Sequence, residues 1–505
     1  MHKLNYLLII ILLFAGCTTN KSGKKYYKDV APPIEETNFK QLTSHEDIIK
    51  YLEKVDSHSN KLTLEYIGNS VEGKKIPLVK FSKAGKVEEN KLKLLMFAQQ
   101  HGNEPSGKEG MLLLINDLLQ NKYDNWLDKV DLLLIPQLNP DGGDKNQRRN
   151  ANNADLNRDH LILEEPETQA IHKVFKNYQP EITVDIHEYY PFSQSWKEFG
   201  YLKNFDIQIG GLTNINIEPQ IIDIFYDNVK PYMQEQLKKE GYSFFEYTLG
   251  NLSDGGRLRH STVSINDGRQ SFGILNTSSY IVEGRRGRDS LDNLEHRARS
   301  QHLTAKGFIE LAAQNAEKIK NTVARGREKL IKNNGEEKIS IQMKHVKGDK
   351  PLQYPLKSVK TGEDTVFVVD EYHSERKSQL NVTKPSAYLI PASDSNLVKW
   401  LDRSFIQYTE YMPSKNHAIY KYKILTNINN ADKDLKNYNV EVELQKCTKK
   451  ITKGDYLMVP TAQLRSNKIT IALEPQSMSG LVNYDSYEYL IKDNNTYPIL
   501  RLEKR

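Results

Sequence analysis

Apolar positions in the first 283 residues form short runs separated by stretches with helical spacing. Ser44, with Asp47 three residues later, is a good N-cap for a helix with apolar residues on one face. Two runs around a glycine-containing turn, 62–68 and 69–81, predict a hairpin. Further strands are predicted at 92–99, 130–137, 182–186 and 278–282, and helices at 110–119 and from Pro166 onward. This alternation predicts an α/β sheet with a crevice at the carboxyl ends of its strands.

The pattern changes near residue 334. A helical stretch at 303–323 gives way to short alternating runs broken by Gly, Pro, Asn and Asp, which predict a β-rich second domain. A chain of 505 residues is long enough for two domains. We therefore expect a catalytic domain at 41–335 and a β-rich accessory domain at 336–505.

The first 40 residues predict an export signal. Lys3 precedes an apolar run at 7–15, which is too short to span a membrane and has the size of a signal-peptide core. Small residues then precede Cys17, an arrangement that resembles the bacterial lipobox. We expect a lipoprotein signal peptide at 1–16, a lipid on Cys17 and a flexible tether at 17–40. The protein would then be extracytoplasmic and anchored to a bacterial membrane, while an ordinary secretory signal is the alternative.

Net charge and cysteine content argue against a nucleic-acid-binding protein and against a disulfide-rich one. The formal charge of +6 is small for this length and is spread along the chain, so it does not argue for nucleic-acid binding. Apart from Cys17 the chain has one cysteine, Cys447, so we expect no disulfide framework.

Three residues at predicted strand ends suit a zinc ion. His101 and Glu104 in the sequence HGNE follow one strand, and His187 ends another. Two nitrogens and a carboxylate are a ligand set for catalytic zinc, which keeps one open position. We expect one Zn²⁺ per chain here, with Asp185 or Glu188 orienting an imidazole.

Glu283, at the end of the strand 278–282, is a candidate general base and acid. A carboxylate beside an activated water can take its proton during attack on a carbonyl and return it to the leaving nitrogen. That chemistry is peptide or amide hydrolysis. An ion pair with Arg285, Arg286 or Arg288 is the structural alternative.

The segment 148–159 offers groups that recognise a carboxylate-containing substrate. The guanidinium of an arginine donates two parallel hydrogen bonds to a carboxylate, and Arg158 has Asn157 beside it. Arg148 and Arg149 are placed to polarise a carbonyl and stabilise an oxyanion. A solvated, Asn-rich loop is the simpler alternative.

In chain order, HGNE, NPDG, RRN, DLNRD, DIHE and VEG resemble the zinc carboxypeptidases related to carboxypeptidase A, over roughly residues 41–325. The resemblance implies a metallocarboxypeptidase-like α/β/α sandwich with a mixed sheet. It also implies that the substrate is a peptide with a free C-terminal carboxylate.

The same resemblance assigns roles to the candidate residues. It implies zinc ligation by His101, Glu104 and His187, and general base and acid catalysis by Glu283. It implies that Arg148 polarises the carbonyl, with Arg149 as the alternative, and that Asn157 and Arg158 hold the C-terminal carboxylate.

Two departures from the family pattern leave other functions open. Family members often carry a mobile tyrosine shortly before the catalytic glutamate, but 249–270 contains none. In addition, Glu283 is followed by Gly284 and an arginine cluster. HGNE also occurs in related zinc deacylases of the aspartoacylase and succinylglutamate desuccinylase kind, which cleave small N-acyl amino acids. A non-catalytic peptide-binding lipoprotein is a third possibility, against which the presence of every ligand and of the base argues.

Overall fold

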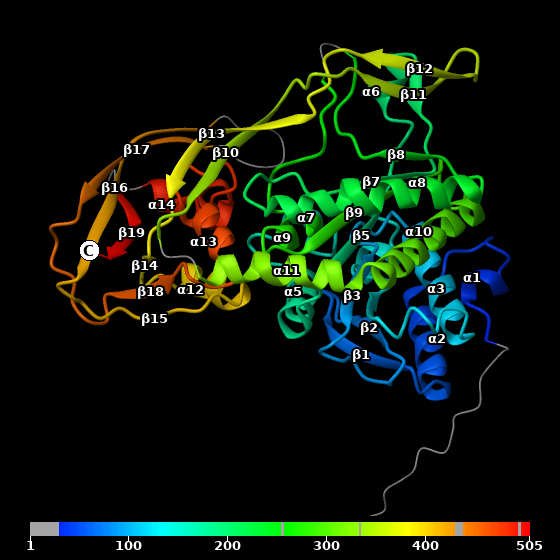
Figure 1. Cartoon of the computed structure of the whole chain (residues 1–505), viewed down its shortest axis with the longest axis horizontal. Coiled ribbons are helices and arrows are strands. Elements are labelled where there is room, and N and C mark those ends of the chain that lie inside the picture. Colours follow the sequence, from blue (N-terminus) through cyan, green and yellow to red (C-terminus); the bar gives the residue numbers. More distant parts are fainter. Residues whose placement is uncertain (1–29, 254–256, 333–334, 430–437, 493–495, 505) are drawn as a thin grey trace, which may run out of the picture.

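The computed structural model describes residues 30–253, 257–332, 335–429, 438–492 and 496–504. Its centre is a twisted mixed sheet (Figure 1). In spatial order the strands of this sheet are β1 (Leu62–Asn69), β2 (Lys75–Phe81), β4 (Val130–Ile135), β3 (Leu92–Ala98), β5 (Ile182–Tyr189), β9 (Ser278–Arg285), β7 (Ile207–Gly210) and β8 (Phe244–Glu246). The adjacent strands β4, β3, β5 and β9 are parallel to one another. The pairs β1–β2, β2–β4 and β7–β9 are antiparallel.

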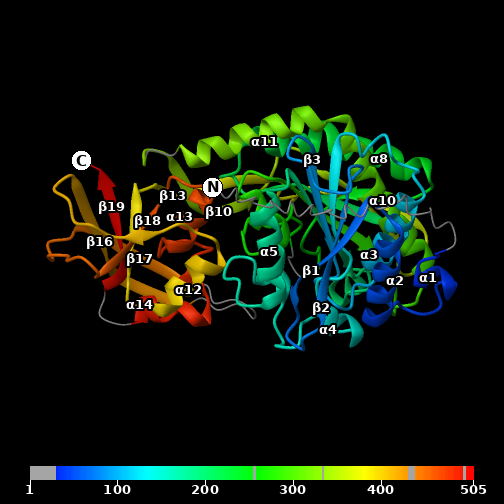
Figure 2. The ribbon, with the colours of Figure 1, turned by 90° about the horizontal axis from the view of Figure 1, so that it is seen from below.

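Helices cover both faces of this sheet. One face packs against α5 (Pro166–Tyr178) and α9 (Gly268–Gly273). The other packs against α2 (His45–His58), α3 (Ser106–Leu119), α8 (Lys230–Lys239), α10 (Leu294–Gln314) and α11 (Ala316–Ile331). Figure 2 shows α5 and α3 on opposite sides of the strands. The central strands β3 and β4 are mostly apolar, with Lys93 and Asp131 as their charged residues, because both faces of the sheet are buried. The predicted α/β/α sandwich with a mixed sheet is therefore confirmed.

The expected elements are present with shifted ends. The hydroxyl of Ser44 accepts a hydrogen bond from the backbone N–H of Asp47, so α2 has the predicted N-cap. Helix α3 starts at Ser106, four residues before the predicted start, because Pro105 occupies the N-cap position. The remaining short elements of this half are α4 (Pro140–Asp144), η1 (Leu156–Arg158), α6 (Gln194–Glu198), β6 (Tyr201–Lys203), α7 (Pro219–Ile224) and η2 (Phe225–Val229).

The last part of the expected tether is folded. Helix α1 (Pro33–Glu36) buries Ile34 against Leu113 of α3 and Ala298 of α10. Phe39 and Leu42 pack against the same cluster, so several apolar contacts hold this short segment on the catalytic half. The signal peptide and Cys17 lie outside the described residues. Among the described residues, no helix combines the length and apolar character needed to cross a membrane.

The C-terminal part is β-rich, as predicted, and also contains helices. Strand β10 (Lys338–Val346) pairs antiparallel with β13 (Glu375–Thr383), and between them in the chain β11 (Leu352–Ser358) and β12 (Asp364–Val369) form a hairpin. A sheet contains, in order, β15 (Thr409–Glu410), β18 (Tyr456–Pro460), β14 (Ala387–Pro391), β19 (Thr496–Lys504), β16 (His417–Asn429) and β17 (Tyr438–Lys446). Its helices are α12 (Ser395–Arg403), α13 (Ser466–Leu473), η3 (Leu481–Asn483), η4 (Asp485–Tyr487) and α14 (Tyr489–Lys492).

The two parts of the chain are closely joined. The indole N–H of Trp400 in α12 donates to the carbonyl of Leu161, 3.0 Å away, and both residues belong to one apolar cluster. Strand β11 pairs with β6, with Leu356 opposite Lys203, so a C-terminal hairpin extends over the catalytic half (Figure 1). The domain boundary expected at 335/336 stays a prediction. Contacts between the two parts place C-terminal residues near the carboxyl ends of the central strands.

Candidate metal centre and active site

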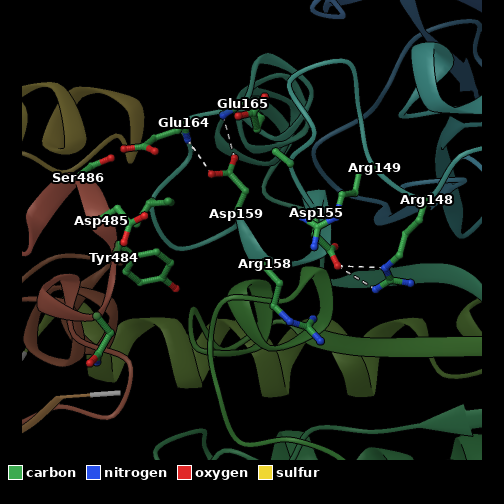
Figure 3. A pocket seen from close by; sticks show the side chains of 13 residues that line it. Arg148, Arg149, Asp155, Arg158, Asp159, Glu164, Glu165, Tyr484, Asp485 and Ser486 are labelled. Carbon is green, nitrogen blue, oxygen red and sulfur yellow. Dashed lines mark hydrogen bonds and ion pairs between the residues drawn. The ribbon is translucent and has the colours of Figure 1, made fainter. Parts of the chain in front are cut away.

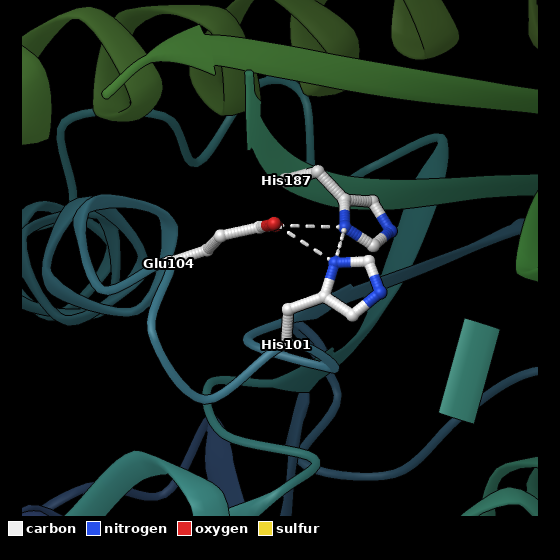
Figure 4. Close-up of side chains that lie close together, drawn as sticks. All are labelled: His101, Glu104 and His187. Atoms are coloured by element: carbon white, nitrogen blue, oxygen red, sulfur yellow. Dashed lines mark hydrogen bonds and ion pairs between the residues drawn. The ribbon is translucent and has the colours of Figure 1, made fainter. Parts of the chain in front are cut away.

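The three expected metal ligands meet at the carboxyl ends of β3 and β5. The Nδ1 atoms of His101 and His187 lie 2.9 Å from the two carboxylate oxygens of Glu104 and 3.1 Å from each other (Figure 4). Their ligand atoms all lie within 4.8 Å of one another, and all three side chains are buried. Two imidazoles and a carboxylate that converge in this way fit a catalytic zinc ion.

The HGNE loop after β3 contacts the NPDG loop, so two motifs that are far apart in the sequence together shape this centre. The chain turns at once, with the N–H of Glu104 bonded to the carbonyl of His101 at 3.0 Å. A Cβ on Gly102 would lie 2.0 Å from the backbone carbon of Gly142, so only glycine fits where the HGNE and NPDG loops touch. The Asn139 side chain accepts from the N–H of Gly142 and caps α4. NPDG therefore turns the chain beside the centre, as its composition predicts.

Two aspartates orient the imidazoles from behind. Asp185 lies 2.8 Å from Nε2 of His187, and Asp155 lies 3.1 Å from Nε2 of His101. A proton held on each Nε2 leaves Nδ1 as the electron-pair donor toward the metal. Asp185 was one of two expected partners. The other, Glu188, instead accepts from Arg297 at 2.7 Å, and Asp155 was not foreseen.

The charges in the cluster depend strongly on one another. Burial alone would raise the pKa of Glu104, but the His101 and His187 imidazoles hold it below its usual range. Burial would lower the pKa of His187, but Asp185 and Glu104 raise it well above its ordinary value. The carboxylates of Glu104 and Asp185 therefore favour the charged form of His187. A divalent ion would supply that positive charge in place of a proton.

Glu283 stands opposite His187 in the pairing of β9 with β5. It is only 9% exposed, and burial raises its pKa to about 7, an effect that the nearby imidazole of His187 partly offsets. Among the described residues, no ion pair joins Glu283 to Arg285, Arg286 or Arg288, so the structural alternative is not what the chain adopts. A carboxylate with a pKa near neutrality is suited to accept and return a proton.

A buried lysine, Lys203 of β6, adds a positive charge near Glu283 that the sequence did not indicate. Its ammonium donates to the carbonyl of Thr248 at 3.2 Å, and burial lowers its pKa to about 8 even though Glu283 opposes that shift. Lys203 reaches this place because β6 pairs with β11 of the C-terminal part. No sequence motif marks it.

The structure distinguishes the two neighbouring arginines. The guanidinium of Arg148 lies 3.5 Å from the Glu104 carboxylate and 3.2 Å from Nδ1 of His101, and Asp155 holds it through two hydrogen bonds of 2.9 and 3.1 Å. Arg149 donates to the carbonyl of Asn153 at 3.1 Å. Arg148 is therefore the arginine that can reach a carbonyl at the metal centre.

Asn157 and Arg158 come next on η1. The Asn157 side chain accepts from the N–H of Gly268 at 2.8 Å and approaches Nε2 of His187 at 3.3 Å, so it is fixed between α9 and the centre. Arg158 is exposed and donates to the Asn157 carbonyl at 2.8 Å. Its other N–H groups donate no further hydrogen bond within the described part of the chain and can bind an anionic group in the adjoining cavity.

That cavity, of about 570 Å³, extends from Arg148 past Arg158 to the C-terminal part. Figure 3 shows Arg158 between Asp155 and Tyr484, with Glu164 and Glu165 on the wall beyond. The C-terminal residues that line it are Asn483, Tyr484, Asp485 and Ser486. The sequence gives no sign that these residues belong to the site, because their position depends on packing between residues more than 300 apart.

The chain is similar to known zinc carboxypeptidases. Residues 48–205 match the family model of zinc carboxypeptidases. Carboxypeptidase 2 of Trichophyton rubrum is 27% identical over 461 residues, which cover 86% of this chain and 81% of that protein. Carboxypeptidase 2 of Trichophyton tonsurans is 25% identical with the same coverage. The solved carboxypeptidase A of Helicoverpa armigera is similar over 55% of this chain and 75% of its own, with 18% identity and a TM-score of 0.43.

Proposed function

This chain belongs to the zinc carboxypeptidase family through residues 48–205 and is a peptidase hydrolase that uses zinc, and we propose that it removes single residues from the C-terminal ends of peptides with Glu283 as the base. The observation that carries the proposal is the position of Glu283. It lies opposite a zinc ligand, is buried, and has a pKa of about 7. Arginines that suit a carbonyl and a carboxylate lie on the same side of the centre.

The residues of the site divide the work of hydrolysis among them. His101, Glu104 and His187 would hold the zinc ion, which when bound supplies Lewis-acid activation of water and of the carbonyl. Glu283 accepts the proton of the attacking water as the C–O bond forms, and then delivers it to the departing amine as the C–N bond breaks.

The arginines and the amide of η1 act on the substrate itself. Arg148 donates to the oxygen of the scissile carbonyl as negative charge develops on it. Asn157 and Arg158 bind the terminal carboxylate, which limits cleavage to the last peptide bond. An enzyme for N-acyl amino acids would use the same groups, so the length of the accepted substrate separates the two activities.

A peptide library analysed by mass spectrometry before and after digestion tests the proposal. We expect loss of single C-terminal residues, about one zinc ion per chain, and a fall in kcat of at least about 100-fold for Glu283→Gln with zinc retained. Glu295→Gln, which changes an exposed glutamate of α10, is the matched control. Cleavage within chains, activity only on N-acyl amino acids, or full activity of Glu283→Gln would overturn the proposal.

We further propose that Cys17 carries a lipid and holds the enzyme on the outer side of a bacterial membrane. The support is the short apolar run that ends in small residues before this cysteine. Labelling cells with a fatty-acid analogue should mark the wild type and not Cys17→Ser. A labelled Cys17→Ser protein would contradict the anchor.

A further inference from the structure

A second cavity, of about 660 Å³, lies at the end of β9 and is strongly basic. It is built from the residues after β9, from α10 and from the C-terminal strand β11. Five cationic side chains line it: Arg285, Arg286, Arg288, Arg297 and Lys357. The carboxylates among its lining residues are Asp206 and Asp292.

These two carboxylates do not neutralise the arginines. Asp206 accepts from His296 at 2.8 Å and from the hydroxyl of Ser243 at 2.7 Å. Asp292 accepts from the backbone N–H of Arg288 at 2.9 Å. Lys357 already has a carboxylate partner outside the lining, Asp364, at 3.3 Å. The positive charge of the cavity therefore exceeds the negative charge that its own lining provides.

Three arginines carry that excess. Arg285 donates to the neutral side chain of Asn204. Arg286 and Arg288 lie over the rings of Tyr190 and Phe192, each 5.7 Å from the ring centre. The Nε atom of Arg286 is buried without a hydrogen-bond partner. Among the described residues, none of the three has a carboxylate within ion-pair distance, although a buried guanidinium N–H without a partner is costly.

The cavity is close to the reaction centre but on the far side from Arg158. Arg285 follows Glu283 by two residues on the same strand. The cavity is lined by α10, which covers one face of the sheet, whereas Asn157 beside Arg158 is bonded to α9 on the other face. A peptide with its terminal carboxylate at Arg158 and its scissile carbonyl beside Glu283 would therefore have the basic cavity on the side opposite its C-terminal residue.

We propose that this cavity binds acidic side chains of the peptide upstream of the scissile bond, so that the enzyme prefers substrates with Glu or Asp near their C-terminal ends. The inference rests on the proposed exopeptidase function. A carboxylate there would pair with Arg286 and Arg288 through charge-assisted hydrogen bonds. The aromatic rings of Tyr190 and Phe192 help to hold Arg286 and Arg288 in place.

The test compares two peptides that differ only by Glu or Gln at the second to fourth residues before the scissile bond. For the wild type we expect kcat/KM about tenfold higher for the Glu peptide. In Arg286→Gln/Arg288→Gln the ratio should fall to about one to threefold. Arg325→Gln, an exposed arginine of α11, should keep the wild-type ratio. Raising the salt concentration should reduce the ratio in the wild type itself, which tests the charge without a variant.

The outcomes separate this inference from the proposed function. If the wild type cleaves neither peptide, the exopeptidase proposal fails. If it cleaves both with equal kcat/KM, the preference is overturned while the exopeptidase remains. Calorimetric binding of inorganic phosphate to the wild type but not to the double variant, together with equal cleavage of the peptides, would identify a site for free anions and overturn the inference as stated.

Discussion

His187 and Glu283 face each other as register partners on the parallel strands β5 and β9, although 95 residues separate them in the chain. Because the register of buried strands is set by their apolar faces, a shift by one residue would turn every side chain to the opposite face. The same pairing places Thr183 opposite Ser279, whose hydroxyls are 2.6 Å apart. The distance between zinc ligand and base is therefore a property of the sheet and not of a loop.

The buried position of Glu283 predicts how activity depends on pH. Burial raises its pKa to about 7, and the base must be ionised to accept a proton, so kcat/KM falls as the pH drops through that pKa. A zinc cation nearby favours the carboxylate, so the acid limb of the profile should lie at or below pH 7. The measurement is kcat/KM from pH 4.5 to 8.5. A flat profile over this range would contradict the role of Glu283.

The two neighbouring arginines should differ sharply when each is changed to glutamine. Arg148→Gln removes the guanidinium beside His101 and Glu104, and we expect kcat to fall about 100-fold to 1,000-fold, as for a lost oxyanion donor. Arg149→Gln serves as the matched control, because the Arg149 side chain donates to the Asn153 carbonyl. Steady-state kinetics of the two variants, together with their zinc content, test this difference. Equal losses in the two variants would be inconsistent with this assignment.

Much of the site could be predicted from the sequence because its residues occur in short local patterns. His101 and Glu104 lie in one turn, and His187 and Glu283 end apolar runs whose burial on both faces requires a parallel sheet. Gly102 and Gly142 also belong to these short motifs, and close backbone contacts leave no room for a side chain at either position.

The residues that escaped prediction depend on contacts between distant segments. Lys203 reaches the centre through pairing of β6 with β11, and Tyr484 through packing of η3 and η4 against the catalytic half. Helix α13 escaped as well, because its β-branched sequence SNKITIAL has the composition of a strand. Ser340 of β10 exchanges hydrogen bonds with Asn216 of the catalytic half, 124 residues away. No local pattern encodes such contacts.

The aspartate behind His187 should control zinc affinity more than catalysis. Asp185 lies 2.8 Å from Nε2 of His187 and accepts from the Gln100 amide. Asp185→Asn keeps the shape and removes the charge, and zinc should bind about 10-fold to 100-fold more weakly. Competition with a fluorescent chelator measures the affinity, and exposed Asp128→Asn is the control. An unchanged zinc affinity would show that Asp185 does not support the ligand.

The C-terminal part should influence substrate binding through Tyr484. This side chain lines the cavity beside Arg158, and its burial raises the pKa of the phenol well above its usual value, so it stays neutral. We expect Tyr484→Ala to raise KM about fivefold to 20-fold with a smaller change in kcat, as for a group that contacts substrate away from the reacting bond. Tyr489→Ala, an exposed tyrosine that does not line the cavity, is the control. A loss confined to kcat would argue against a substrate-binding wall.

Lys468 of α13 should make stability depend on pH. It is 3% exposed, its ammonium donates to the carbonyl of His160 at 3.3 Å, and burial lowers its pKa to about 7. In the unfolded chain the pKa of a lysine is near 10.4, so between about pH 7 and 10 the unfolded chain holds one more proton than the folded protein. The buried lysine therefore destabilises the fold fully below pH 7, and this destabilisation becomes smaller as the pH rises above 7. Lys468→Met should raise the free energy of unfolding by about 1–3 kcal/mol at pH 6 and by less at pH 9.5, even though the His160 carbonyl loses its donor. Urea denaturation of both proteins at the two pH values measures this difference, and an equal effect at both would show that Lys468 keeps its proton in the folded state.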